Sequence, residues 1–372
     1  MTATVGKNAD GSRIRKQFLG ISKKEAEQKR DEYLSHLKSG LNLDFENMAL
    51  SELMRTWLFQ VVKVNASDNT FDRYESVHRN YVANGELAPL KVFQIERLHL
   101  QTHYNKMAEK GFTHSQIFNL NKLLRMFFNY ALDEGYIRKN PCVRLAIPKN
   151  EDKTAKVDPF TDEEIRQILE TAKGSMKAIF QLGLSTGLRR GELLGLEVRY
   201  INLSSGAVDV QITQKKVKKF GGVEGHKRVT IFEPPKTKSS IRTVPVPSAL
   251  LEDLQKHLKN EEKKHFELGV PFSEQSLFFT SEACTPFDGK NITTAWQRLL
   301  KRAGVRYRSF HNIRHTYATK LFEARVPLIT ISHLLGHANT NITANVYISV
   351  MPKEKESAAE ELNYLFKCVE VL

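Results

Sequence analysis

The chain has 372 residues and a formal net charge of +14, from 56 lysines and arginines against 42 aspartates and glutamates. Apolar residues make up 41% of it, which is enough to bury ordinary cores in two or three domains and excludes a disordered or collagen-like chain. No apolar run approaches the roughly 18 residues of a membrane helix, and the N-terminus lacks a signal-peptide pattern, so we expect a cytoplasmic protein with no membrane partner.

Residues 1–43 are predicted to form a small basic module, a short exposed strand followed by a helix. Ile14, Phe18 and Ile21 are spaced among basic residues as on a strand, and residues 23–40 have a helical composition. The module is too small to bury a large core by itself, and a mobile basic arm would fit the same residues.

Residues 44–150 are predicted to form an all-helical domain. One apolar helix face consists of Leu50, Leu53, Met54, Trp57 and Leu58. A second helix carries Ile117, Leu120, Leu124, Phe127, Phe128 and Ala131. Thr113 and Gln116 have the spacing of a capping box before this second helix, and Gly135 and Pro141 end it. The polar segment 147–158 is the predicted linker.

Residues 151–350 are predicted to form a mixed α and β domain. Thr161 and Glu164 have the spacing of a second capping box. Segments 207–213, 228–232 and 241–247 are rich in β-branched residues, which is typical of short strands. In residues 351–372 apolar side chains recur at helical spacing: Ala358, Leu362, Leu365, Phe366 and Val369.

Two stretches within this domain are strongly basic. Residues 215–242, a candidate hairpin, contain nine lysines and arginines against two glutamates. Residues 289–322 contain eight lysines and arginines and no acidic residue. Clustered cations neutralise phosphates and release counterions, so we expect a nucleic-acid partner, although a solvated basic face is the alternative for either stretch.

Two short stretches place polar groups beside predicted helix ends. In residues 185–194 a glycine turn precedes Arg189, and Glu192 at i+3 can fix the guanidinium, although a surface ion pair has the same pattern. In residues 309–315 His311 and Arg314 converge near a helix N-terminus, where a phosphate is favoured.

A third stretch, residues 326–337, predicts a short apolar helix. Pro327 fits its first position and Gly336 its C-terminal stop, so His337 is expected in the turn just beyond it. Tyr347 follows ten residues later. A single tyrosine in such a segment ordinarily packs in a core.

Metal and nucleotide chemistry have little support. The pairs His311 with His315 and His333 with His337 have a spacing that can bind zinc, but neither contains the glutamate of a His-Glu-x-x-His motif. The three cysteines, Cys142, Cys284 and Cys368, are far apart, so neither a thiolate site nor a disulfide framework is expected. Phosphate-loop, dinucleotide and Gly-x-Ser-x-Gly motifs are also missing, and we expect no metal and no cofactor.

Taken together, the motifs resemble the tyrosine recombinase (phage-type integrase) family in order and spacing. The matching segments are Thr186-Gly187-Leu188-Arg189 with Glu192, Lys236-Thr237, Arg242-Thr243-Val244-Pro245, His311-x-x-Arg314-His315, Leu335-Gly336-His337 and Tyr347. The catalytic resemblance covers about residues 158–350, and the whole chain is similar to three-part integrases of temperate phages and integrative conjugative elements.

This resemblance implies an architecture. Residues 1–43 would be an arm-site DNA-binding module of strand and helix, short for the family, and residues 44–150 an all-α core-binding domain. Residues 151–350 would be the mixed α+β catalytic domain. Residues 351–372 would form a C-terminal helix that contacts a neighbouring subunit, with folding back onto its own subunit as the alternative.

The resemblance also implies a role for each matched residue. Tyr347 would attack the scissile phosphate and leave a 3′-phosphotyrosyl strand, with His311 as the acid/base for the phenol proton. Arg189, Arg314 and His337 would bind the non-bridging oxygens, and Glu192 would support Arg189. Lys236, expected in the turn of the basic hairpin, would protonate the departing 5′ oxygen, with Lys238 two residues away as the alternative.

The implied function is that of a site-specific recombinase which integrates and excises a mobile element. Its partners would be double-stranded DNA, three further copies of the chain in a tetramer, and an excision factor or a host DNA-bending protein. The expected location is the bacterial cytoplasm, on the nucleoid. The alternatives are DNA relaxation of the type IB topoisomerase kind and a non-catalytic DNA-binding regulator.

Overall fold

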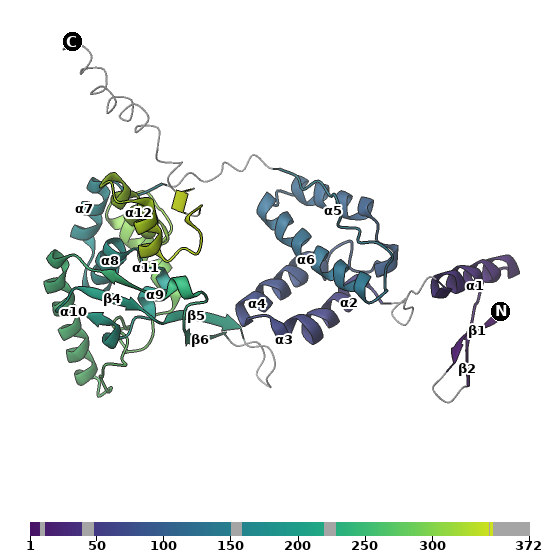
Figure 1. The fold of residues 1–372 in the computed structure, drawn as a ribbon, viewed down its shortest axis with the longest axis horizontal. Helices are drawn as coiled ribbons and strands as arrows, with labels where there is room; N and C mark the ends of the chain where they lie inside the picture. The colour runs from purple at the N-terminus through teal and green to yellow at the C-terminus, as the bar shows by residue number, and fades with distance from the viewer. Residues whose placement is uncertain (8–11, 39–47, 150–157, 219–227, 342, 345–372) are drawn as a thin grey trace, which may run out of the picture. The chain divides into compact units, whose positions relative to one another are not determined.

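The computed structural model describes residues 1–7, 12–38, 48–149, 158–218, 228–341 and 343–344 (Figure 1). The chain divides into two compact units, Met1–Asp152 and Lys153–Leu372. Tyr347, residues 351–372 and most of the predicted linker lie outside the described residues. In the part of the chain that is described, no helix is long and apolar enough to cross a membrane.

The N-terminal module is a hairpin followed by a helix. β1 (Thr2–Lys7) pairs antiparallel with β2 (Arg13–Gln17), and α1 (Lys23–Lys38) follows. Phe18 is buried and meets the ring of Tyr33 edge-on at 5.3 Å. The prediction of a single strand was wrong, because β1 pairs with β2 to form a hairpin. Ile21 was also misplaced: it lies beyond the end of β2, is fully exposed, and donates its N–H to Glu25.

The following residues are helical. The elements are α2 (Leu50–Trp57), α3 (Lys63–Asn65), α4 (Asp68–Val77), α5 (Arg97–Glu109) and α6 (His114–Asp133). The predicted apolar face of α2 is buried, and Trp57 meets Phe127 of α6 edge-on at 5.5 Å. The Thr113–Gln116 capping box is confirmed. Two π-helical turns, Leu58–Val62 and His78–Val82, were not predicted.

The second unit is mixed α and β, as predicted. Its helices are α7 (Asp162–Thr171), α8 (Gly174–Thr186), α9 (Arg190–Leu194), α10 (Ser248–Glu267), α11 (Gly289–Arg302), α12 (Asn312–Glu323) and α13 (Leu328–Leu335). Its strands are β3 (Ile201–Asn202), β4 (Ala207–Val210), β5 (Thr213–Lys218), β6 (Arg228–Glu233) and β7 (Arg242–Pro245).

The strands form two small antiparallel sheets. One has the order β3-β4-β7, and the other is the β5-β6 hairpin, paired from Thr213 with Glu233 to Lys218 with Arg228. The predicted strand 207–213 is therefore divided between β4 and β5. The basic hairpin exists, but Lys236 does not lie in its turn, because it follows β6 in the segment that leads to β7.

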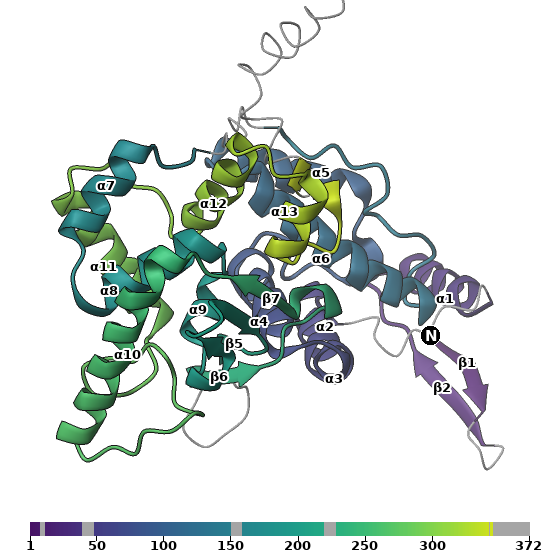
Figure 2. The same ribbon diagram turned by 60° about the vertical axis from the view of Figure 1, so that its left-hand side comes forward.

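An aromatic core holds the second unit together. The ring of Trp296 stacks on Phe180 at 5.5 Å, while Phe160 and Phe310 meet it edge-on at 5.8 and 5.6 Å. The Thr161–Glu164 capping box is confirmed. α8 packs against α12 and α10, and α13 packs against both α12 and β7 (Figure 2). This packing brings the end of α13 close to β7.

Candidate active site

The turn between α8 and α9 orients Arg189. Gly187 ends α8 with φ of +62°, and a Cβ there would lie only 2.3 Å from Cδ1 of Tyr317. Only glycine fits this conformation and this space. The next residue, Leu188, is buried, and Arg189 follows in an extended conformation as the N-cap of α9.

Glu192 is a buried carboxylate held by two arginines. Its Oε1 accepts from Nη1 of Arg189 at 2.7 Å, and its Oε2 accepts from the backbone N–H of Arg189 at 2.9 Å. Arg242 donates to the same two oxygens at 3.3 and 3.0 Å. Burial alone would raise the pKa of Glu192, but the hydrogen bonds and charges of Arg242 and Arg189 lower it below its ordinary value.

Arg242 is the one member of this cluster to which the sequence analysis gave no role. A signal was present: Arg242 and Val244 are two residues apart on β7, so both point to the side that Val244 buries. The sequence could not show which group Arg242 meets there, because Glu192 lies fifty residues away in the chain.

Arg314 connects two loops of the site from within the protein. Its side chain is buried, Nη1 donates to the carbonyl of Gly187 at 2.8 Å, and Nη2 donates to the carbonyl of Leu335 at 2.5 Å. Burial and the nearby charge of Arg189 lower its pKa to about 9, so the guanidinium stays charged at pH 7. Arg314 therefore ties the Arg189 turn to the end of α13.

His337 lies just beyond α13, as predicted. The helix ends at Gly336, with φ of +65°, and begins at Leu328, so Pro327 precedes it and does not occupy its first position. Nδ1 of His337 is 2.8 Å from Oγ1 of Thr343. Burial and the charges of Arg314, Arg189 and Arg242 lower the pKa of His337 to about 4, so the ring is neutral at pH 7.

His311 is the residue that precedes α12. Its ring meets His315 edge-on at 4.7 Å and keeps an exposed side. Burial of its packed side and the charges of His315, Arg314 and Arg189 lower the pKa of His311 to about 4. His311 is therefore also neutral at pH 7.

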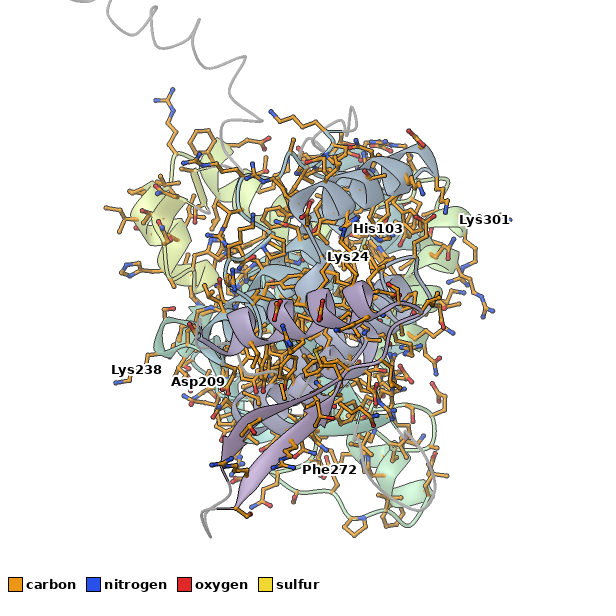
Figure 3. The ribbon with its side chains drawn as sticks, turned by 90° about the vertical axis from the view of Figure 1, so that its right-hand side faces the viewer. Lys24, His103, Asp209, Lys238, Phe272 and Lys301 are labelled. Atoms are coloured by element: carbon orange, nitrogen blue, oxygen red, sulfur yellow. The ribbon has the colours of Figure 1, made fainter. Side chains whose placement is uncertain are left out.

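A cavity of about 350 Å³ is lined by some of these groups, whereas His311, Arg314 and Arg242 are not among its lining residues. Four of the predicted residues line it: Arg189, Glu192, Lys236 and His337. Lys215, Thr213, Thr237 and Ser240 contribute to its walls as well. Lys238, two residues from Lys236, is not among the lining residues, and its exposed side chain extends outward (Figure 3). Of the predicted site residues, only Tyr347 lies outside the described part of the chain.

The predicted histidine pairs do not form a metal cluster. Among the described residues, no group of three or more histidine, cysteine, aspartate or glutamate side chains is placed to hold a metal ion. His333 is exposed on α13, whereas His337 lies past the end of that helix, so the two do not share a helix face. Cys142 and Cys284 are both free thiols, and Cys368 lies outside the described residues.

Comparisons with known proteins identify relatives of this chain. The model of the phage integrase family matches residues 159–354. A protein named "Tyrosine recombinase XerC-like" from Caldanaerobacter subterraneus subsp. tengcongensis is 44% identical over 98% of this chain and 96% of its own length. The ICEBs1 integrase of Bacillus subtilis is 23% identical over 95% of this chain and 94% of its own.

Solved structures share the fold. The Tn1549 transposon integrase, in complex with a circular intermediate DNA, aligns with a TM-score of 0.68 at 22% identity, over 85% of this chain and 99% of that one. A lambda integrase dimer bound to a COC′ core site aligns with a TM-score of 0.58 at 17% identity, over 91% of this chain and 90% of that one.

Proposed function

Because the chain belongs to the phage integrase family and is a tyrosine-type site-specific recombinase, an enzyme that breaks and rejoins DNA, we propose that it integrates and excises a mobile element. The observation that carries the proposal is the convergence of Arg189, Lys236 and His337 on one cavity, with Arg314 directly behind it. The relatives named ICEBs1 integrase and Tn1549 transposon integrase support the mobile-element part.

The reaction is a phosphoryl transfer that begins at Tyr347. Its phenol, with an ordinary pKa of about 10, needs a proton acceptor and a positive field at pH 7. His311 is neutral and has an exposed side, so it takes the phenol proton as the Tyr347 oxygen bonds to phosphorus. The bond between phosphorus and the 5′ oxygen breaks, which leaves a 3′-phosphotyrosyl strand.

Charge builds up on the non-bridging oxygens in the transition state, and cationic or neutral donors oppose it there. Arg189 supplies positive charge from the cavity wall, and bidentate guanidinium bonds suit a phosphate. Arg314 is buried and does not line the cavity, so its charge acts on the same oxygens from behind the carbonyls of Gly187 and Leu335. His337 adds a neutral donor: when the Thr343 hydroxyl donates to Nδ1, the ring proton lies on Nε2 and points to the phosphate.

Lys236 supplies the proton for the departing 5′ oxygen. It lines the cavity, whereas Lys238 does not, and this favours Lys236 among the two lysines of the segment. When the 5′ hydroxyl of a second strand attacks the phosphotyrosine, the same groups run the reaction in reverse. The covalent bond preserves the phosphodiester energy, so the step requires neither nucleotide hydrolysis nor a metal.

The DNA would be bound by all three parts of the chain. We assign arm sites to residues 1–43, core sites to residues 44–150 and the scissile phosphate to residues 151–350. Four protomers would act on two duplexes, as in the lambda integrase tetramer on a Holliday junction, with residues 351–372 packed on a neighbour. An excision factor or a host DNA-bending protein would determine whether the reaction runs toward integration or excision.

The test is covalent trapping on a nicked duplex that carries the element's end sequence. We expect a slower band on a denaturing gel with the natural protein and none with Tyr347→Phe. A band that survives in the variant would assign the nucleophile elsewhere. DNA binding without a band from either protein would favour the regulator.

Strand exchange separates a recombinase from a topoisomerase. Two differently labelled sites should yield a joined product that carries both labels. Relaxation of a supercoiled plasmid without that product would overturn the proposal in favour of the topoisomerase alternative.

A further inference from the structure

Arg242 lies behind the wall of the cavity. Its side chain is 7% exposed, and it is not among the residues that line the cavity. All three nitrogens of its guanidinium donate to groups of the protein. A buried arginine is costly unless its charge is paired and its N–H groups are hydrogen-bonded. The partners of Arg242 therefore indicate its role.

The guanidinium of Arg242 donates to three separate segments of the site. Nη1 and Nη2 donate to the two oxygens of Glu192, which itself holds Arg189. Nε donates to the carbonyl of Leu334 at 2.6 Å, in the last turn of α13 before His337. Nη1 also donates to the carbonyl of Ser240 at 2.9 Å, at the end of the segment that begins at Lys236.

The contact with α13 is close as well as directional. A Cβ on Gly336 would lie 3.0 Å from Nη1 of Arg242 and 2.9 Å from the carbonyl oxygen of Ser239. The turn that carries His337 therefore rests directly on Arg242. The two oxygens of Glu192 accept from both arginines, so the position of the Arg189 guanidinium depends on how Arg242 holds that carboxylate.

We propose that Arg242 is a positioning residue that fixes Arg189 and His337 at the distances needed to bind the non-bridging oxygens of the scissile phosphate. This inference rests on the proposed function. Its chemical basis is the planar fork of arginine, which donates in three directions at once. A lysine keeps the charge beside Glu192, but its three donors lie on one nitrogen, whereas Arg242 meets Leu334, Ser240 and Glu192 through three separate nitrogens.

The experiment compares Arg242→Lys with the natural protein in single-turnover cleavage of the nicked duplex. We expect the cleavage rate to fall about 100-fold, the effect of displacing catalytic groups by about 1 Å, while the dissociation constant for the DNA changes less than about 3-fold. The matched control is Arg199→Lys, which alters an arginine paired with Glu197 away from the cavity lining. The control should cleave at the natural rate.

A second substrate separates positioning from loss of folded enzyme. A methylphosphonate at the scissile position is uncharged, so it depends much less on donors to the non-bridging oxygens. On this substrate we expect the rates of Arg242→Lys and the natural protein to differ by less than about 5-fold. A general loss of folded protein would slow both substrates by the same factor, which would overturn the inference.

The remaining outcomes are distinguishable. An Arg242→Lys rate equal to the natural rate on phosphodiester would overturn the inference alone, and failure of the natural protein to cleave would overturn the proposed function and the inference with it. If Arg242→Lys does not unfold cooperatively, the double variant Glu192→Gln with Arg242→Gln, which leaves no lone buried charge, takes its place. It should show the same selective recovery on methylphosphonate, and equal losses on both substrates would again count against positioning.

Discussion

At the scale of single residues, the neutral histidines of the site have a consequence for stability. The folded pKa of His337 is about 4, below the ordinary 6.5. Between these pH values the unfolded chain binds a proton that the folded chain does not, so the free energy of unfolding rises with pH there. The contribution of the lowered His337 pKa to the free energy of unfolding is complete above pH 6.5 and is lost as the pH falls to 4.

We therefore expect a weaker pH dependence of stability in His337→Gln. The measurement is urea unfolding of the second unit between pH 4 and 7, followed by Trp296 fluorescence in a Trp57→Phe background, because these are the two tryptophans of the chain. The exposed His333→Gln is the control and should retain the natural slope. Identical slopes in both variants would contradict the assigned cause.

Gly187 gives a second prediction, because it combines left-handed backbone with a contact to Tyr317. Gly187→Ala should destabilise the second unit by about 3 kcal/mol, from roughly 1 kcal/mol of backbone strain and the remainder from overpacking. Gly304 has a similar φ of +70°, but a Cβ there would meet nothing within 4 Å, so Gly304→Ala should cost only about 1 kcal/mol. Urea midpoints measure the difference, and equal costs would mean that the ring of Tyr317 moves aside.

The site itself was only partly predictable at this scale. Short motifs predicted the Arg189–Glu192 contact, because the two residues are only three positions apart in the chain. They did not predict that Glu192 is shared with Arg242, or that Arg314 bonds the carbonyls of Gly187 and Leu335. Those partners are far apart in sequence and meet only through the packing of α8, α12, α13 and β7.

At the scale of elements, local signals predicted helices and their starts well. The side chains of Thr113 and Thr161 cap α6 and α7 through residues three positions later, so four adjacent residues contain the whole signal. β1 was missed because Thr2–Lys7 contains a single large apolar residue, Val5, and is fixed by pairing with β2. Lys236 was expected in the turn of the hairpin but follows β6, because the pairing of β5 with β6 decides where the hairpin ends.

The start of the second unit is fastened to the segment before α12, and this gives a third prediction. Arg308 is 8% exposed, forms ion pairs with Asp158 and Glu164 at 2.8 Å each, and lies over the ring of Phe160. Arg308→Ala should destabilise the unit by about 2 kcal/mol, because it removes packing and leaves two carboxylates without their shared partner.

Arg306 is the matched control for Arg308. It also pairs with Asp158, but its side chain is 70% exposed, and exposed ion pairs contribute little. Arg306→Ala should therefore change the stability by less than about 0.5 kcal/mol. Thermal unfolding of the full chain in the Trp57→Phe background, followed by Trp296 fluorescence, measures both variants. Equal losses would show that burial of the pair is not the cause.

At the scale of the whole molecule, the charge of +14 is divided between cations that are already paired and cations that are available to DNA. Lys256 belongs to the first group, because its ammonium lies 2.7 Å from Glu252. Lys238 has an exposed side chain two residues from Lys236 and has no ion pair among the described residues. Net charge alone therefore does not give the number of phosphates that the protein neutralises.

The salt dependence of DNA binding measures that number directly. Each phosphate contact contributes about −0.9 to the slope of log K against log salt concentration on duplex DNA. Lys238→Gln should make the slope shallower by about 0.9 and weaken binding equally on any sequence, since a phosphate contact reads no base. Lys256→Gln should leave the slope unchanged, because its charge is already compensated by Glu252. A slope that changes equally in both variants would mean that the long-range field of the protein, and not local contact, determines its affinity for DNA.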